Sequence, residues 1–90
     1  MSNQLTAIVT ITTTEGWHAR PATEFARIAG ESGQLVTIGR VGSEAVRGDS
    51  VLMLLTLGAR HGEELEITVS VDSGDANSAQ QVLESLTALF

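Results

Sequence analysis

The sequence predicts an α+β fold, an open-faced sandwich in which a four-stranded antiparallel sheet carries three helices, two long and one short, on one face. Two observations predict this class. Segments with an apolar residue at every second position alternate along the chain with segments whose apolar residues recur every three or four positions. The clearest strand segment also keeps a polar side, which is typical of an antiparallel sheet with one face in water. The expected order is strand, helix, strand, strand, short helix, strand, helix.

The first strand and the first helix are expected from this apolar spacing. Residues 5–12 alternate between apolar and polar side chains, and their predicted buried set is Leu5, Ala7, Val9 and Ile11. The first helix is expected to follow His18, with apolar residues at positions i, i+3, i+4 and i+7: Ala22, Phe25, Ala26 and Ala29. Gly30 and Gly33 come next and are interpreted as stop signals.

The middle of the chain predicts a hairpin and a short helix. Residues 34–40 and 43–47 form two short strands around a turn at Val41 and Gly42, with Gly39 interrupting the alternation. An apolar run between residues 48 and 58 opens with capping residues and closes with glycine, which indicates a short helix. A short helix with so many apolar side chains cannot bury all of them against the sheet. We therefore expect some of Val51, Leu52 and Leu55 to stay exposed for docking. A fully buried helix is the alternative.

The last strand and the last helix have the strongest patterns. Residues 64–71 alternate regularly, with Leu65, Ile67, Val69 and Val71 on the predicted buried side. Asp75 is the expected N-cap of the final helix. Its apolar stripe runs to the end of the sequence and is expected to cover the sheet: Ala79, Val82, Leu83, Leu86 and Phe90.

Composition limits the classes of function. Ninety residues predict one domain, spanning residues 1–90. With no cysteine and two distant histidines, we expect neither a metal nor a cofactor. Five arginines against eleven acidic residues give a net charge of −6, which argues against a nucleic-acid partner. The N-terminus lacks a basic region followed by a long apolar run, and no apolar stretch approaches the roughly 20 residues of a membrane span, so we expect a cytoplasmic protein without membrane insertion. We also expect a monomer.

The most informative motif is the segment at residues 16–22, Gly-Trp-His-Ala-Arg-Pro-Ala. If His18 is the N-cap, the first-turn amides lack acceptors within the helix, and Pro21 loses nothing by having no N–H group. Those amides, the positive end of the helix and Arg20 would together favour an anion, of which a phosphoryl group fits best. Histidine is also a fair nucleophile near neutral pH. The alternative is a polar loop histidine beside an ordinary helix start.

This motif and the element order resemble HPr, the histidine-containing phosphocarrier family of the phosphoenolpyruvate-dependent sugar phosphotransferase system. The motif is similar to the family signature Gly-Leu-His-Ala-Arg-Pro-Ala, and a second match runs from Asp49-Ser50-Val51-Leu52 to Thr56-Leu57-Gly58. The resemblance covers essentially the whole chain. It implies that His18 accepts a phosphoryl group on Nδ1 from enzyme I and passes it to an enzyme IIA domain, with Arg20 assisting.

The resemblance also extends to regulation and has two departures. Ser50 aligns with the serine that HPr kinase/phosphorylase modifies in some members, although serine is also an ordinary helix cap. Many of those members have lysine before that serine, where this chain has Asp49. Trp17 replaces the usual leucine. Its ring is expected either to pack under the loop or to widen the docking surface.

We hypothesise that partners dock around this loop. Arg20 and Arg27 would steer an acidic partner, with Trp17, Val51, Leu52 and Leu55 as apolar contacts.

Other functions stay open from the residues alone. Within the resemblance, the alternatives to sugar uptake are a regulatory (nitrogen-related) branch and a dihydroxyacetone phosphotransferase branch. An acylphosphatase-like enzyme and a ligand-sensing module are alternatives from other classes, because fold is a poor guide to function. His61 is interpreted as a polar loop residue.

Overall fold

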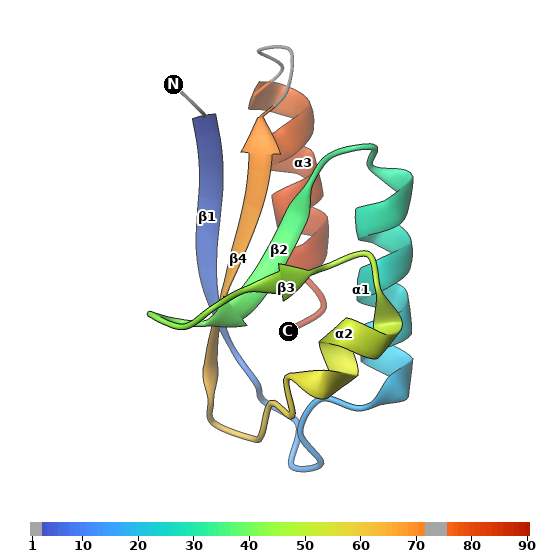
Figure 1. The fold of residues 1–90 in the computed structure, drawn as a ribbon, viewed down its shortest axis with the longest axis vertical. Coiled ribbons are helices and arrows are strands. Elements are labelled where there is room, and N and C mark those ends of the chain that lie inside the picture. Colours follow the sequence, from blue (N-terminus) through green and yellow to red (C-terminus); the bar gives the residue numbers. More distant parts are fainter. Residues whose placement is uncertain (1–2, 72–75) are drawn as a thin grey trace.

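A sheet and a set of helices form the two layers of the molecule (Figure 1), in a computed structural model that describes residues 3–71 and 76–90. The strands of the described residues are β1 (Asn3–Thr10), β2 (Val36–Arg40), β3 (Val46–Arg47) and β4 (Glu64–Val71). The helices of the described residues are α1 (Ala19–Glu31), α2 (Val51–Thr56) and α3 (Ala76–Thr87). The observed order is the predicted one.

The sheet is antiparallel throughout and has the strand order β1-β4-β2-β3. Its buried face carries the predicted alternating residues of β4, since Leu65, Ile67 and Val69 have no exposed surface. The opposite face has no helix over it in Figure 1, and there Ile8 is exposed. The open-faced arrangement inferred from the polar alternation of the strands is therefore confirmed.

Three predicted strands have boundaries that differ from the structure. The first strand covers Asn3–Thr10 instead of residues 5–12. Ile11 still exchanges backbone hydrogen bonds with the loop before β4, accepting from Gly62 at 2.8 Å and donating to Glu63 at 2.9 Å, before the chain turns away. The second strand starts at Val36 instead of residue 34.

The third strand is the shortest, because it contains only Val46 and Arg47 instead of residues 43–47. The preceding residues form the predicted turn, which is closed by an N–H of Ser43 that donates to the carbonyl of Arg40 at 2.9 Å. Gly42 has a φ of 81° there, a conformation that favours glycine.

Helix α1 continues through Gly30 and ends at Glu31, so the first of the two predicted stop signals is wrong. The second is confirmed, because Gly33 takes a φ of 72° immediately after the C-cap residue Ser32. Glycine inside a helix costs stability but does not end it when the apolar stripe continues, and here Ala29 is still buried against the core.

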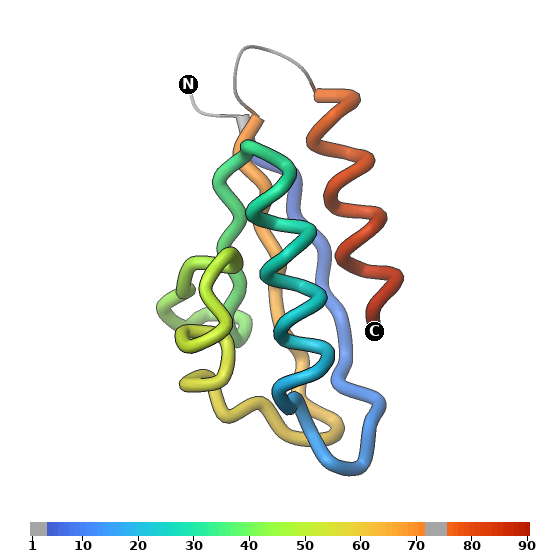
Figure 2. Tube along the Cα trace, turned by 90° about the vertical axis from the view of Figure 1, so that its right-hand side faces the viewer, coloured from blue at the N-terminus to red at the C-terminus, as the bar shows by residue number. Residues whose placement is uncertain are grey.

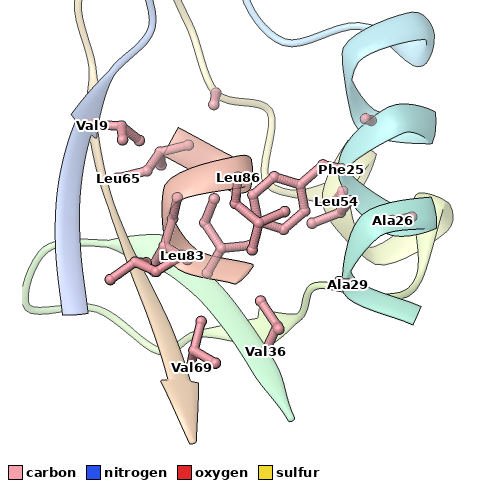
Figure 3. Close-up of a cluster of buried hydrophobic side chains, with 14 of the residues drawn as sticks. Val9, Phe25, Ala26, Ala29, Val36, Leu54, Leu65, Val69, Leu83 and Leu86 are labelled. Atoms are coloured by element: carbon pink, nitrogen blue, oxygen red, sulfur yellow. The ribbon is translucent and has the colours of Figure 1, made fainter. Parts of the chain in front are cut away.

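The core lies between the sheet and all three helices (Figure 3). Phe25 from α1, Leu54 from α2 and Leu86 from α3 converge there and are fully buried. Complete burial of a side chain of this kind contributes about 1.5–3 kcal/mol. One side chain from each helix meets the other two above the sheet. The position of α1, including its first residue, therefore depends on all three of these side chains.

Helices α1 and α3 lie side by side with opposite directions, so the end of α3 reaches the beginning of α1 (Figures 1 and 2). The predicted stripe of α3 is buried at Ala79, Leu83 and Leu86. The helix itself ends at Thr87, however, so Phe90 is not part of a continuous helical stripe. The predicted N-cap, Asp75, lies outside the described residues.

None of the helices among the described residues combines the length and the apolar character that crossing a membrane requires.

Candidate functional site

His18 lies at the N-terminal boundary of α1, as the sequence predicts. Its backbone is extended, with φ −121° and ψ −173°, and its carbonyl accepts the hydrogen bond from the N–H of Ala22 at 3.2 Å. This is the geometry of an N-cap, but the side chain makes no capping hydrogen bond. The imidazole is instead 44% exposed. The ring is therefore accessible to another protein.

The first turn of α1 has free hydrogen-bond donors. The N–H groups of Ala19 and Arg20 have no acceptor within residues 3–71 and 76–90, and Pro21 has no N–H to satisfy. The Arg20 side chain is exposed and makes no hydrogen bond or ion pair with any described residue. The exposed ring therefore lies beside two free backbone N–H groups, one unpaired guanidinium and the positive end of a helix. This combination is suited to binding an anion.

An acidic side chain also contacts the ring. Oε1 of Glu15 lies 3.4 Å from Nε2 of His18, and the Glu15 side chain is 76% exposed. The sequence places this carboxylate near His18 along the chain, but only the structure shows which ring nitrogen it approaches.

The loop before His18 is held in place by backbone contacts with the segment after α2. The N–H of Trp17 donates to the carbonyl of Ala59 at 3.0 Å. Gly16 has a φ of 74°, and a Cβ added there would lie only 2.7 Å from the same carbonyl oxygen. Because both the conformation and the close approach require glycine, Gly16 fixes how the chain enters the site.

The ring of Trp17 packs beneath this loop. Its centroid lies 5.4 Å from that of Phe25 in an edge-to-face arrangement and 5.7 Å from that of Phe90. The side chain is only partly exposed. Of the two alternatives for Trp17, the structure favours packing under the loop. Phe90 completes this aromatic cluster from beyond the end of α3.

An ion pair between Arg40 and Glu63 supports the segment after α2, to which the loop before His18 is bound, and sequence reasoning missed it. Arg40 Nε donates to Glu63 Oε2 at 2.7 Å and Nη2 donates to Oε1 at 2.9 Å. Arg40 Nη1 also donates to the carbonyl of Leu57 at 2.9 Å. The hydrogen bonds from Arg40 and from the backbone N–H of Arg60 lower the pKa of Glu63 from 4.5 to about 2.

This ion pair can be predicted only when the strand pairing is known, because Arg40 lies at the end of β2 and Glu63 lies just before β4. Arg40 pairs with Leu65 across the sheet, which brings residues 23 positions apart in the sequence into contact. Composition and periodicity contain no signal for it.

The expected basic spot is smaller than predicted. Arg27 is bound to two acidic residues of its own helix: it donates to Glu24, and Nη1 donates to Glu31 Oε1 at 3.0 Å. The charge of Arg27 is therefore largely compensated within α1. Of the two arginines proposed for steering, Arg20 alone is unpaired among the described residues.

The predicted apolar patch lies on α2, which packs against α1 (Figures 1 and 2). Leu52 is 72% exposed and Leu55 is 40% exposed, whereas Val51 is partly buried against the core. Met53 is also exposed and was not predicted as part of this patch. The buried Leu54 anchors the helix, and its neighbours remain accessible.

Ser50 is the N-cap of α2, as expected from its residue type. Its Oγ accepts a hydrogen bond from the N–H of Met53 at 3.3 Å. The preceding Asp49 accepts a hydrogen bond from Arg47 at 2.8 Å. The hydroxyl of Ser50 thus has a structural role in starting the helix.

A metal site is not formed by the described residues, in which no three histidine, aspartate or glutamate side chains cluster suitably.

Residues 5–90 match the family described as the PTS HPr component phosphorylation site. The chain is also 41% identical, over 75 residues, to the phosphocarrier protein HPr of Streptomyces coelicolor, an alignment that covers 83% of this chain and 75% of that protein. The chain belongs to the HPr family. It is therefore a phosphocarrier of the phosphotransferase relay rather than a catalytic enzyme, as the signature predicts.

Solved HPr structures have the same fold. The phosphocarrier protein HPr from Bacillus anthracis gives a TM-score of 0.79 at 24% identity, covering 96% of this chain and 95% of that one. HPr-C-His from Thermoanaerobacter tengcongensis gives a TM-score of 0.75 at 23% identity, covering 93% and 91% of the two chains. Membership of the HPr family implies enzyme I and enzyme IIA as partners, and it displaces the acylphosphatase-like and ligand-sensing alternatives.

Proposed function

We propose that His18 is the residue that carries the phosphoryl group, accepting it on Nδ1 from phosphoenolpyruvate-charged enzyme I and passing it to an enzyme IIA domain. The observation that carries this proposal is the exposed, uncapped imidazole at the start of α1, beside the free N–H groups of Ala19 and Arg20. A phosphoryl group on the ring would meet donors that no other described group uses.

Arg20 is proposed to stabilise the charge of the phosphoryl group during transfer. Its guanidinium is exposed and unpaired among the described residues, so it can approach an incoming dianion without breaking an existing ion pair. A mobile cation suits a carrier, because the group must be held during diffusion and then released.

For docking we propose the face formed by Arg20, Arg27, Val51, Leu52 and Leu55, with Trp17 supporting the adjacent loop through its contacts with Phe25 and Phe90. The exposed Leu52 and Leu55 support an apolar contact, and the free Arg20 supports steering of an acidic partner. Arg27 contributes less charge than an unpaired arginine would, because Glu24 and Glu31 bind it. An Arg27→Glu variant is expected to fold and to accept phosphoryl groups more slowly, and an unchanged rate would remove Arg27 from the docking face.

We also propose that residues 1–90 form one monomeric, cytoplasmic domain that serves carbohydrate uptake. We further propose Ser50 as the site at which HPr kinase/phosphorylase would act. The hydroxyl already caps α2, and the negative charge of Asp49 beside it opposes a phosphate there.

The test is incubation with phosphoenolpyruvate and enzyme I, followed by intact mass measurement. We expect one added phosphoryl group that is labile in acid and absent from His18→Ala. The matched control is His61→Ala, which removes the other histidine of the chain and should still be modified. Modification that persists in His18→Ala but disappears in His61→Ala would overturn the assignment.

A further inference from the structure

The contact between Glu15 and His18 involves a single nitrogen of the ring. Oε1 of Glu15 is 3.4 Å from Nε2. The loop that carries both residues is anchored by the N–H of Trp17, which donates to the carbonyl of Ala59, and Gly16 packs closely against the same carbonyl. In a neutral imidazole one nitrogen carries the proton and the other carries the free lone pair. A carboxylate beside Nε2 favours the proton at Nε2, which leaves the lone pair on Nδ1.

We propose that Glu15 is a positioning residue that presents Nδ1 of His18 to the phosphoryl donor and then makes the phosphorylated ring a better donor. The inference rests on the proposed role of His18. After transfer, phosphorus is bonded to Nδ1 and the proton remains on Nε2, so the ring is positively charged. The Glu15 carboxylate stabilises that proton.

The proton on Nε2 decides how easily the phosphoryl group leaves. When an acceptor attacks phosphorus, the bond between phosphorus and Nδ1 breaks and its electron pair stays on Nδ1. If Nε2 is protonated, the departing ring is neutral imidazole. If it is not, the departing ring is an imidazolate anion, which is a much poorer leaving group. The acceptor is a nucleophile of enzyme IIA in the relay, or water in spontaneous hydrolysis.

Repulsion acts in the same direction. The phosphoryl group brings negative charge to a ring that already has a carboxylate beside it, which weakens the phosphorylated state relative to the free one. Both effects favour donation over retention. The effect of Glu15 on the phosphorylated ring is expected to be as small as that of an exposed ion pair, because the side chains of Glu15 and His18 are both substantially exposed.

Other charged groups lie on the elements around the ring. On α1 they are Arg20 and the mutually paired Glu24, Arg27 and Glu31. On the segment after α2 they are Arg60 and Glu63, which is bound to Arg40, together with the titratable His61. A Glu15→Gln substitution leaves all of them in place and keeps the size of the side chain. A difference between the two proteins therefore reports the charge of Glu15.

The experiment compares phosphorylated wild type with phosphorylated Glu15→Gln between pH 6 and pH 9. We expect the half-life of the substituted protein near neutral pH to be about two- to fivefold longer. The curve of its hydrolysis rate against pH is expected to shift towards lower pH by about half a pH unit. Transfer to enzyme IIA is expected to slow by a similar factor. The matched control is Glu44→Gln, which removes the same charge from the exposed turn between β2 and β3 and should follow the wild type.

The outcomes separate this inference from the proposed function. If wild type acquires no phosphoryl group on His18, the proposed function fails. If both proteins are phosphorylated and their pH curves coincide, the role of Glu15 fails alone. Slower hydrolysis in Glu15→Gln with unchanged transfer to enzyme IIA would also overturn the proposed role of Glu15. That result would mean that the carboxylate activates water and does not act on the ring.

Discussion

Arg40 holds Glu63 through two parallel hydrogen bonds of 2.7 and 2.9 Å, and this pair ties the end of β2 to the loop that supports His18. The same guanidinium reaches the carbonyls of Leu57 and Gly58, so one side chain organises most of the segment between α2 and β4. The carbonyl of Ala59, to which Trp17 is bound, belongs to that segment.

Stability is expected to depend on this pair and on pH. The folded pKa of Glu63 is about 2, below its ordinary value of 4.5, so its contribution is present above pH 4.5 and is lost as pH falls towards 2. Glu63→Gln should melt at a lower temperature than wild type at pH 7 and lose less on acidification. Circular dichroism melts between pH 7 and pH 2 measure this. Parallel acid profiles for the two proteins would contradict it, and Glu66→Gln on the open face of the sheet is the control.

Gly16→Ala is expected to destabilise the protein by at least about 1 kcal/mol and to slow phosphorylation of His18. The new Cβ meets the carbonyl of Ala59 at 2.7 Å in addition to the strain of a φ of 74°. Gly33→Ala is the matched control, because its φ is 72° but nothing lies within 4 Å of the added atom. Denaturant unfolding of both variants separates steric contact from backbone strain. Equal losses would show that the contact with Ala59 does not matter.

Two leucines of α2 are expected to separate stability from docking. Leu54 is fully buried, so Leu54→Ala should cost about 2–5 kcal/mol of the free energy of unfolding. Leu52 is 72% exposed, so Leu52→Ala should change that free energy by no more than about 0.5 kcal/mol. The same Leu52→Ala protein should exchange phosphoryl groups with its partners more slowly. Wild-type exchange rates in a stable Leu52→Ala protein would place the docking surface elsewhere.

Ser50→Ala should lower stability by about 0.5–2 kcal/mol, because the N–H of Met53 loses its acceptor at the start of α2. Ser50→Asp keeps an acceptor at the same position and should recover most of this loss. Thermal unfolding of the three proteins decides the matter. If Ser50→Ala is as stable as wild type, the hydroxyl is not an effective cap.

The elements that sequence reasoning placed best are those whose pattern is local. The alternation of Leu65, Ile67 and Val69 predicts β4, and the spacing from Ala22 to Ala29 predicts α1, because each pattern needs only one partner surface. The position of His18 as N-cap follows in the same way. Gly30 misleads because a glycine stops a helix only where the chain needs a left-handed residue, and that residue is Gly33.

The parts that could not be predicted depend on contacts between distant segments. Arg40 and Glu63 meet only because β2 lies beside β4, and Trp17 meets Phe90 only because α3 runs back towards the start of α1. The pairing of Arg27 could not be predicted either, although its partners are close in the sequence. Its spacing from Glu24 and Glu31 permits ion pairs, but the spacing alone does not show that both form.

The aromatic cluster beneath the loop has a practical consequence. Trp17 is the only tryptophan of the chain, and it directly precedes His18 in the sequence. Its ring is in contact range of Phe25 and Phe90, so a rearrangement of the loop changes the surroundings of the one strong natural fluorophore. We therefore expect any loop rearrangement that accompanies phosphoryl transfer to change the intrinsic emission, which is recorded with no dye attached.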